Sequence, residues 1–132
     1  MKVLIACEYS GIVRDAFTKK GHNAWSCDIL PTESEGNHYQ GDVLNYLDEG
    51  WDMMIAHPPC TYLTIAGNRW FNEEKYGDKA RERKQLRVKA AEFFKKLINA
   101  NIPKICVENL VGYINTNYKK PNQIIHPCYF GD

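Results

Sequence analysis

The chain has 132 residues, enough for one domain with its own core, and its 44% hydrophobic content is ordinary for a globular protein. No apolar run approaches the roughly 20 residues that cross a bilayer, and the opening run is too short for a secretory signal peptide. We therefore expect a cytoplasmic protein without membrane contact. The formal net charge of +1 gives no global electrostatic reason to bind nucleic acid.

Five cysteines are scattered along the chain, and none of their spacings forms a metal-ligand pair such as C-x-x-C. Without an export signal, free thiols are expected, and no metal site is predicted. Three of the five close apolar runs and are expected to pack as small hydrophobic side chains. Only Cys60 has neighbours that argue for reactivity, because it follows two prolines.

In chain order, the first part of the sequence alternates strand and helix patterns, which predicts a parallel sheet of the α/β class. Residues 2–7 form a continuous apolar run typical of a buried strand, residues 11–20 a helix, and residues 22–27 a second strand. Residues 28–39 are polar and contain proline and glycine, so we expect a loop there. Residues 41–47 form a short extended or helical piece.

The second part of the chain continues the alternation. Met53–Ala56 is the next central strand, and residues 61–77 are polar and aromatic without a clean period, which predicts a long, mobile loop. Residues 79–100 form the strongest helix pattern, in which apolar side chains recur at helical spacing at Leu86, Ala90, Phe94, Leu97 and Ile98. Residues 102–107 form another strand before a poorly patterned tail. The expected fold is a single doubly wound α/β domain over residues 1–132.

Residues suited to chemistry follow the predicted strands. Two prolines cannot extend a strand ladder, so Cys60 is expected on a rigid turn at a strand's carboxyl end, where open α/β sheets place their chemistry. The turn at residues 7–11 leads into a helix whose first amides favour acceptors, so it is either a site for a nucleotide-like cofactor or a plain structural turn. Asp28 stands where an acid can hold ribose hydroxyls. Asp42 is either a cofactor ligand or a helix N-cap.

Together these segments resemble the DNA cytosine-5 methyltransferases, with the motifs in that family's order and at similar spacing. Residues 5–21 are similar to the family's opening strand, turn and helix, with matches at Gly11, Arg14, Ala16, Phe17 and Gly21. Three further matches are Gly41-Asp42-Val43 to Gly-Asp-Ile, His57-Pro58-Pro59-Cys60 to the nucleophile motif, and Val107-Glu108-Asn109-Leu110 to Glu-Asn-Val. The resemblance covers nearly the whole chain and is closest to small phage-type cytosine methyltransferase-like proteins.

The resemblance implies S-adenosylmethionine-dependent methylation of cytosine C5, in DNA or in a smaller cytosine substrate. The Cys60 thiolate would add to C6, and the enamine so formed would attack the methyl group of S-adenosylmethionine. Glu108 would hydrogen-bond N3 and the exocyclic amine of the ring. The residues implied in the cofactor site are Gly11, Asp28, Asp42 and Pro58, and those implied in substrate binding are Asn109 and Arg69.

Several residues keep two interpretations at this stage. His57 either influences Cys60 or is a hydrogen-bonded core histidine, and Asn109 either orients the loop after Pro59 or is a turn residue. Residues 61–71, which include Arg69, resemble the family's mobile catalytic loop, which closes over a flipped base, or simply pack the loop to the domain. One face of the long helix either meets phosphates or is a solvated surface, and its residues are Arg81, Arg83, Lys84 and Arg87.

Relative to the family, the chain is shortened at its carboxyl end and has no room for a target-recognition domain. The missing strands would leave one sheet edge bare, so we expect pairing with a second copy or aggregation. The main alternative function is a degenerate methyltransferase fold that binds cofactor or nucleic acid without turnover. Methylation of an exocyclic amine is a weaker alternative, because that motif needs an aromatic residue where Cys60 stands.

Overall fold

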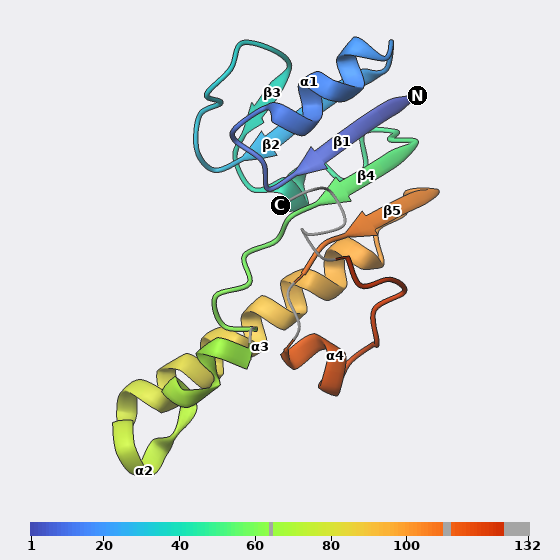
Figure 1. The fold of residues 1–132 in the computed structure, drawn as a ribbon. Coiled ribbons are helices and arrows are strands. Elements are labelled where there is room, and N and C mark those ends of the chain that lie inside the picture. Colours follow the sequence, from blue (N-terminus) through green and yellow to red (C-terminus); the bar gives the residue numbers. More distant parts are fainter. Residues whose placement is uncertain (64, 110–111, 126–132) are drawn as a thin grey trace.

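The computed structural model describes residues 1–63, 65–109 and 112–125. Within them, five strands form one sheet in the order β3-β2-β1-β4-β5, and every neighbouring pair is parallel (Figure 1). The strands are β1 (Lys2–Ala6), β2 (Asn23–Asp28), β3 (His38–Gln40), β4 (Met53–Ala56) and β5 (Lys104–Val107). The predicted α/β class with a parallel sheet is confirmed.

Two longer helices cover opposite faces of this sheet (Figure 1). α1 (Ile12–Lys19) connects β1 to β2, and its Phe17 packs against a cluster that contains Val3 and Ile5. α3 (Asp78–Ile98) precedes β5, and its fully buried Leu97 belongs to the cluster of the other face, which contains Leu4. The continuous apolar run of β1 is explained by this arrangement, because alternate side chains enter the two cores.

Stacked aromatic rings extend the second core beyond the edge of the sheet. The Tyr39 ring stacks on Trp25 with centroids 4.7 Å apart and on Tyr46 with centroids 4.3 Å apart. Trp51 meets Tyr39 edge-on at 6.5 Å and donates its indole N–H to the Tyr46 carbonyl at 2.6 Å. We call these four side chains the aromatic ladder. It fixes the segment between β3 and β4, which includes the 3₁₀ helix η1 (Val43–Asn45).

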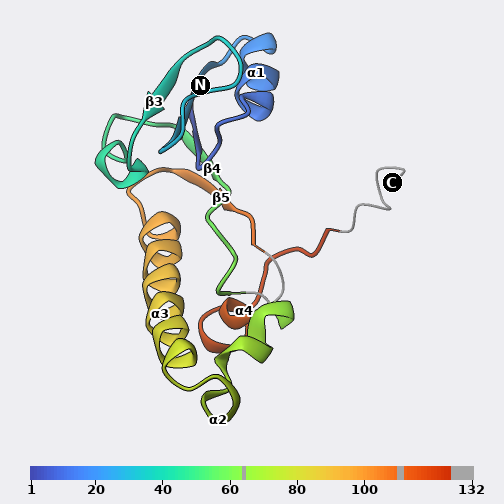
Figure 2. The same ribbon diagram turned by 90° about the vertical axis from the view of Figure 1, so that its left-hand side faces the viewer.

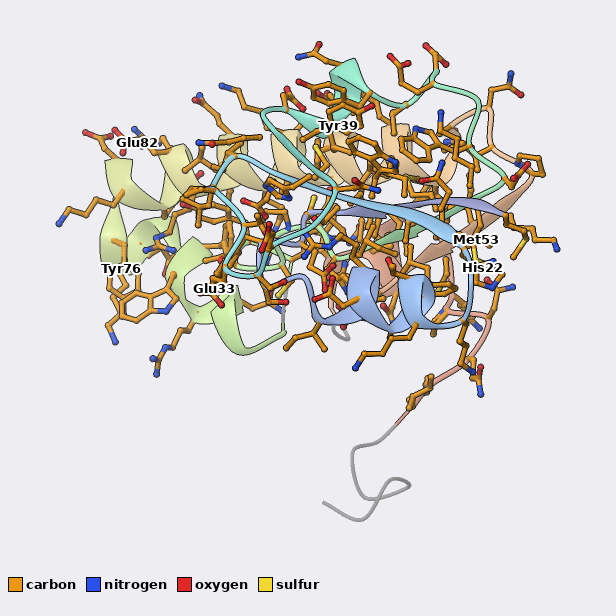
Figure 3. The ribbon with its side chains drawn as sticks, turned by 90° about the horizontal axis from the view of Figure 1, so that it is seen from above. His22, Glu33, Tyr39, Met53, Tyr76 and Glu82 are labelled. Carbon is orange, nitrogen blue, oxygen red and sulfur yellow. The ribbon has the colours of Figure 1, made fainter. Side chains whose placement is uncertain are left out.

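α3 is longer than the strands that it covers, because 21 helical residues span roughly 30 Å. Its amino-terminal part therefore projects past the carboxyl ends of the strands, together with η2 (Ile65–Phe71) and α2 (Glu73–Tyr76) (Figures 1 and 2). We call residues 65–90 the arm. Figure 3 shows Tyr76 and Glu82 of the arm at one end of the molecule, with Met53 and His22 at the other.

Three expectations about individual segments were wrong. Residues 61–77 do not form one long loop, since η2 and α2 lie within them and the Asn72 side chain caps α2 by accepting from two backbone N–H groups. The expected loop at 28–39 ends early, because His38 and Tyr39 begin β3. Leu86 is exposed rather than in the core, because it lies on the arm beyond the sheet. The poorly patterned tail contains a further short helix, α4 (Tyr113–Asn117).

β5 forms one edge of the sheet among the residues described, and its outward side chains, Lys104 and Cys106, are exposed. The expectation that cysteines closing apolar runs are packed therefore holds for Cys27, which is buried, and fails for Cys106. The four cysteines within the described residues are free thiols, whereas Cys128 lies outside them. In the described parts of the chain, no helix combines the length and apolarity needed to cross a membrane.

Candidate functional site

The residues that follow the strands gather along one edge of the sheet, because the strands are parallel and share their carboxyl ends. Successive strands lie on opposite sides of β1, so the switch point where open α/β sheets hold ligands falls between β1 and β4. A pocket of about 290 Å³ opens there, lined by Cys7, Glu8, Tyr9, Ser10 and His57. The strand-end residues predicted from the sequence lie along this edge, and a chemical function for them stays a prediction. We call this the strand-end pocket.

The turn between β1 and α1 is closed by one of its own side chains. The buried carboxylate of Glu8 accepts the backbone N–H of Val13 at 2.7 Å and that of Arg14 at 3.2 Å, and it also accepts the Ser10 hydroxyl at 3.3 Å. These amides are the ones that would otherwise attract an anionic group at the start of α1. Any ligand carboxylate must therefore find its donors elsewhere in the pocket.

Arg14 is the most enclosed charged side chain of the described residues, with 1% of its surface exposed. Its guanidinium pairs with Asp15 at 2.9 Å and donates to Ser26 and Ser34 at 2.9 and 2.6 Å. Further hydrogen bonds reach the Thr32 hydroxyl and the Ser34 and Glu35 carbonyls. Arg14 thus ties the loop between β2 and β3 to α1.

Gly11 occupies the left-handed region with φ of 78°, and a Cβ there would collide with the side chains of Arg14 and Ser34. The space that the glycine leaves is therefore filled by the chain itself. This internal close approach explains the glycine, and its part in a cofactor site stays a prediction.

Asp28 and Asp42 lie near each other at the ends of β2 and β3. Asp42 accepts the Leu44 backbone N–H at 3.0 Å, so the N-cap interpretation is confirmed, although the helix that it caps is the short η1. Asp28 accepts the Leu30 N–H at 2.9 Å. Burial, with smaller contributions from nearby Asp28, Cys27 and Asp42, raises the pKa of the Cys7 thiol from 9.0 to about 12. Cys7 is therefore a neutral thiol facing an acidic region.

Cys60 lies half-buried on a turn after the buried Pro58, as the sequence predicts. The Cys60 carbonyl accepts the Leu63 N–H at 2.9 Å, and the Leu63 carbonyl accepts the Tyr113 N–H at 2.8 Å. Leu63 itself is fully buried beside Phe94 of α3. The nucleophile candidate is therefore fixed between β4 and a buried anchor three residues later.

His57 and Glu108 face each other across the ends of β4 and β5. The register pairs Ala56 with Val107, the Glu108 N–H donates to the Ala56 carbonyl at 3.0 Å, and His57 Nδ1 lies 3.9 Å from a Glu108 carboxylate oxygen. The Glu108 side chain is 57% exposed and thus accessible to a ligand. His57 Nε2 is buried and has no hydrogen-bond partner within the described residues. His57 is therefore not a fully satisfied core histidine. Asn109 follows, half-buried.

Of the four residues of the basic helix face, Arg87 is half-buried, and its guanidinium is held by the chain itself. It donates to the Tyr62 carbonyl and to the Asn68 side chain, both at 2.6 Å, and stacks 3.6 Å from the Phe71 ring centroid. Burial lowers the pKa of Arg87 below its ordinary value. Arg87 anchors the segment after Cys60 to α3. Arg69, the other predicted substrate residue, lies on the arm and does not line the strand-end pocket.

Comparison of the chain with protein-family models, with curated proteins and with solved structures found no match. The fold and the site geometry therefore carry the functional argument alone.

The hydrogen bonds by which Glu8 and Arg14 hold the neighbouring loops were not predicted from the sequence. A signal was present, because Glu8 directly follows a buried-type run and precedes the helix start by four residues, a place where a carboxylate must find donors. The partners of Arg14 are spread over residues 15–35, and no sequence pattern connects them.

Proposed function

We propose that this chain is an S-adenosylmethionine-dependent methyltransferase that acts on cytosine C5, in DNA or in a smaller cytosine substrate. One observation supports the proposal above all. Pro-Pro-Cys60 and Glu108-Asn109 follow adjacent parallel strands beside the switch point of the sheet. A thiol for addition to a ring and an acid for hydrogen bonding to it are thus available at one edge.

The residues around the strand-end pocket fit the charge of the cofactor. Glu8 lines the pocket, and the Asp28 and Asp42 carboxylates act on Cys7, which lines it too. Such an acidic surround suits S-adenosylmethionine, which carries a net positive charge, and carboxylates can accept its amine and ribose hydroxyls. The buried Nε2 of His57, which has no hydrogen-bond partner among the residues that the structure describes, offers one more polar contact. Bound there, the cofactor supplies an electrophilic methyl group.

The chain's own residues would prepare cytosine for that group. The Cys60 sulfur forms a bond to C6, which moves electron density to C5 and makes that carbon nucleophilic. A protonated Glu108 would donate to N3 and so stabilise the ring while the sulfur adds. His57, 3.9 Å from Glu108, is placed to exchange a proton with it or to hold its orientation. Once C5 carries the methyl group, transfer of the C5 proton to solvent water would re-form the C5–C6 double bond and expel the Cys60 thiolate, while the N3 proton returns to Glu108.

Covalent trapping tests this proposal directly. The purified chain is incubated with S-adenosylmethionine and DNA that contains 5-fluorocytosine, and adducts are mapped by peptide mass spectrometry. Because fluorine cannot leave as a proton does, C5 chemistry should leave the DNA bonded to Cys60. The Cys60→Ser variant should give no adduct, whereas Cys106→Ser, which removes an exposed thiol on β5, should trap like the unaltered chain.

A second candidate is a module that binds cofactor or nucleic acid without turnover. The observation that favours it is the Glu8 carboxylate, which already occupies the α1 amides, so a bound cofactor would lack the donors that orient its own carboxylate for methyl transfer. Calorimetric titration with S-adenosylmethionine, beside an Asp28→Ala, Asp42→Ala double variant, separates the outcomes. Saturable binding that the double variant loses, without a Cys60 adduct, would establish the module. No binding by the folded chain would overturn both cofactor-dependent interpretations.

A further inference from the structure

A second hollow lies on the arm, away from the strand-end pocket. It has a volume of about 590 Å³ and is lined by Asn68, Arg69, Trp70, Asn72, Lys75 and Tyr76. None of these residues lines the strand-end pocket. Figure 3 shows Tyr76 at the outer end of the molecule, where η2, α2 and the start of α3 come together. We call this the arm hollow.

The arm hollow presents aromatic surface to solvent. The Trp70 side chain is 37% exposed, and its ring lies 5.2 Å from the Tyr76 ring at an angle of 45°. A tryptophan of this exposure is not needed for the core of the arm, since the buried side chains of the adjacent core are Leu63, Ala91, Phe94 and Ile114. Two tilted rings at the rim of a hollow form a surface on which a planar ligand can stack.

Three cations lie against these rings, and none of them has a carboxylate partner in the part of the chain that the structure describes. The Arg69 guanidinium is 4.7 Å from the Trp70 centroid, the Arg83 guanidinium is 5.6 Å from it, and the Lys75 ammonium is 5.5 Å from Tyr76. Within the described residues, ion pairs on the arm involve other cations, namely Arg81 with Asp78 and Lys84 with Glu73. Positive charge therefore remains uncompensated where the aromatic surface is exposed.

The two asparagines of the arm hollow add donors rather than acceptors. The Asn68 side-chain oxygen already accepts from Arg87 at 2.6 Å, and the Asn72 oxygen accepts two backbone N–H groups of α2. Their amide nitrogens, together with Arg69 and Lys75, make the polar lining cationic and donor-rich. The matching ligand combines a flat ring with an anion that accepts several hydrogen bonds. A nucleotide within a strand has both, whereas an acidic peptide lacks the ring.

We propose that the arm hollow binds single-stranded nucleic acid, with one unpaired base stacked on Trp70 and its phosphate held by Arg69 and Lys75. Paired bases in a duplex do not expose their faces, so stacking on Trp70 selects unpaired nucleotides. This inference goes beyond the proposed methylation, because it assigns a separate site and a form of nucleic acid. It does not require methyl transfer or cofactor binding to occur.

Fluorescence anisotropy of labelled oligonucleotides with the full chain tests the site. A thymidine strand of about 12 nucleotides should bind more tightly than a duplex of equal length. Trp70→Ala should weaken strand binding by roughly 5- to 150-fold, the range for loss of one base–aromatic stack, and Trp70→Phe should restore most of it. Arg69→Ala should weaken binding and reduce the salt slope, log K against log salt concentration, by about 0.7.

Matched controls come from a similar pair outside the hollow. Tyr118 is 40% exposed, and the Lys95 ammonium lies 4.8 Å over its ring, yet neither residue lines the arm hollow. Tyr118→Ala and Lys95→Ala should therefore leave strand affinity within about two-fold of the unaltered chain. A uridine strand of equal length distinguishes the sources. Equal affinity for the thymidine and uridine strands means that the arm hollow contacts base and phosphate but not the sugar. Tighter binding of the uridine strand identifies RNA as the ligand.

The proposal is overturned if duplex binds as tightly as the single strand, or if Trp70→Ala binds the strand like the unaltered chain. It is also overturned if Tyr118→Ala weakens binding as much as Trp70→Ala. Because Trp70 is exposed, its substitution should leave the thermal midpoint nearly unchanged, which circular dichroism verifies. Titration of Trp70→Ala with S-adenosylmethionine is independent of these results, so failure of the methylation proposal can be recognised separately.

Discussion

Replacing Arg14 with methionine tests the interpretation that a buried guanidinium holds the loop between β2 and β3. Methionine keeps much of the aliphatic volume but removes the charge and six hydrogen bonds, which reach Asp15, Ser26, Thr32, Ser34 and Glu35. Part of this loss is recovered, because the Asp15 carboxylate is 41% exposed and rehydrates, and Ser26 keeps its bond to His38 at 2.7 Å. The buried remainder does not recover.

We therefore expect Arg14→Met to lower the free energy of unfolding by about 2–4 kcal/mol, because hydrogen bonds to a buried charged group are lost although no buried charge is left unpaired. This is a large part of the roughly 5–15 kcal/mol that stabilises a typical domain. The thermal midpoint should fall by roughly 8–16 °C. Urea denaturation followed by far-UV circular dichroism measures the change, and hydrogen exchange should show protection lost first in residues 29–37.

Arg81→Met is the matched control, because Arg81 pairs with Asp78 at 2.7 Å but its side chain is 64% exposed. An exposed pair contributes about 0–1 kcal/mol, so this variant should unfold almost like the unaltered chain. If Arg14→Met and Arg81→Met differ by less than about 1 kcal/mol, the idea that Arg14 fixes the loop is refuted.

The same variant carries a pH signature. The hydrogen bond from Arg14 lowers the pKa of Asp15 below its ordinary 3.8, and Ser34 contributes to this shift. A lowered carboxyl pKa adds stability above about pH 4 that is lost as the pH falls through the lowered value. The effect is small because Asp15 is well exposed. In Arg14→Met, the loss of stability that comes from protonating Asp15 at acid pH should disappear. Denaturation of both proteins at a series of pH values measures this difference.

Three further expectations follow from the contacts described. Gly11→Ala should lower the free energy of unfolding by about 2 kcal/mol or more, because the added Cβ meets other side chains. Gly21→Ala, with φ of 89° and open space around it, should lower it by only about 1 kcal/mol, and urea denaturation of both variants measures the difference. At pH 8, Cys27, whose burial raises its pKa to about 12, should alkylate far more slowly than exposed Cys106, and equal rates by peptide mass spectrometry would contradict this. Arg87→Met should speed hydrogen exchange in residues 61–71 without unfolding the sheet, and unchanged exchange there would exclude the anchoring function.

The strands and the long helix were predictable because their patterns are local. The four apolar residues at Met53–Ala56 match β4 in full, and the helical spacing of Phe94 and Leu97 reports burial of one face of α3. Leu86 has the same spacing but is exposed, because a periodic pattern does not tell where the sheet ends. Short helices such as η2 escape prediction, since one or two turns have too few residues to show a period.

Only those residues of the candidate site that directly follow strands could be placed from the sequence. Cys60, Glu108 and Asp42 follow strands, so the parallel topology places them at one edge. Side chains that serve the loops were not predictable, because their partners are distant in sequence. Arg87 reaches Tyr62, 25 residues earlier, and a helical wheel shows it only as one basic residue among several. Whether a charge faces water or a loop depends on tertiary contacts.

The aromatic ladder gives the unlabelled protein an optical reporter. Trp25, Tyr39 and Tyr46 are close enough for their ring transitions to couple, which produces signed bands in near-ultraviolet circular dichroism. The ladder adjoins the acidic region, since a Cβ on Gly41 would lie 3.4 Å from the Tyr46 hydroxyl and Asp42 is the next residue. A ligand held by Asp42 should therefore alter those bands. One that stacks on Trp70, the tryptophan outside the ladder, should instead quench its emission. Occupancy of the two sites can thus be followed separately by light alone.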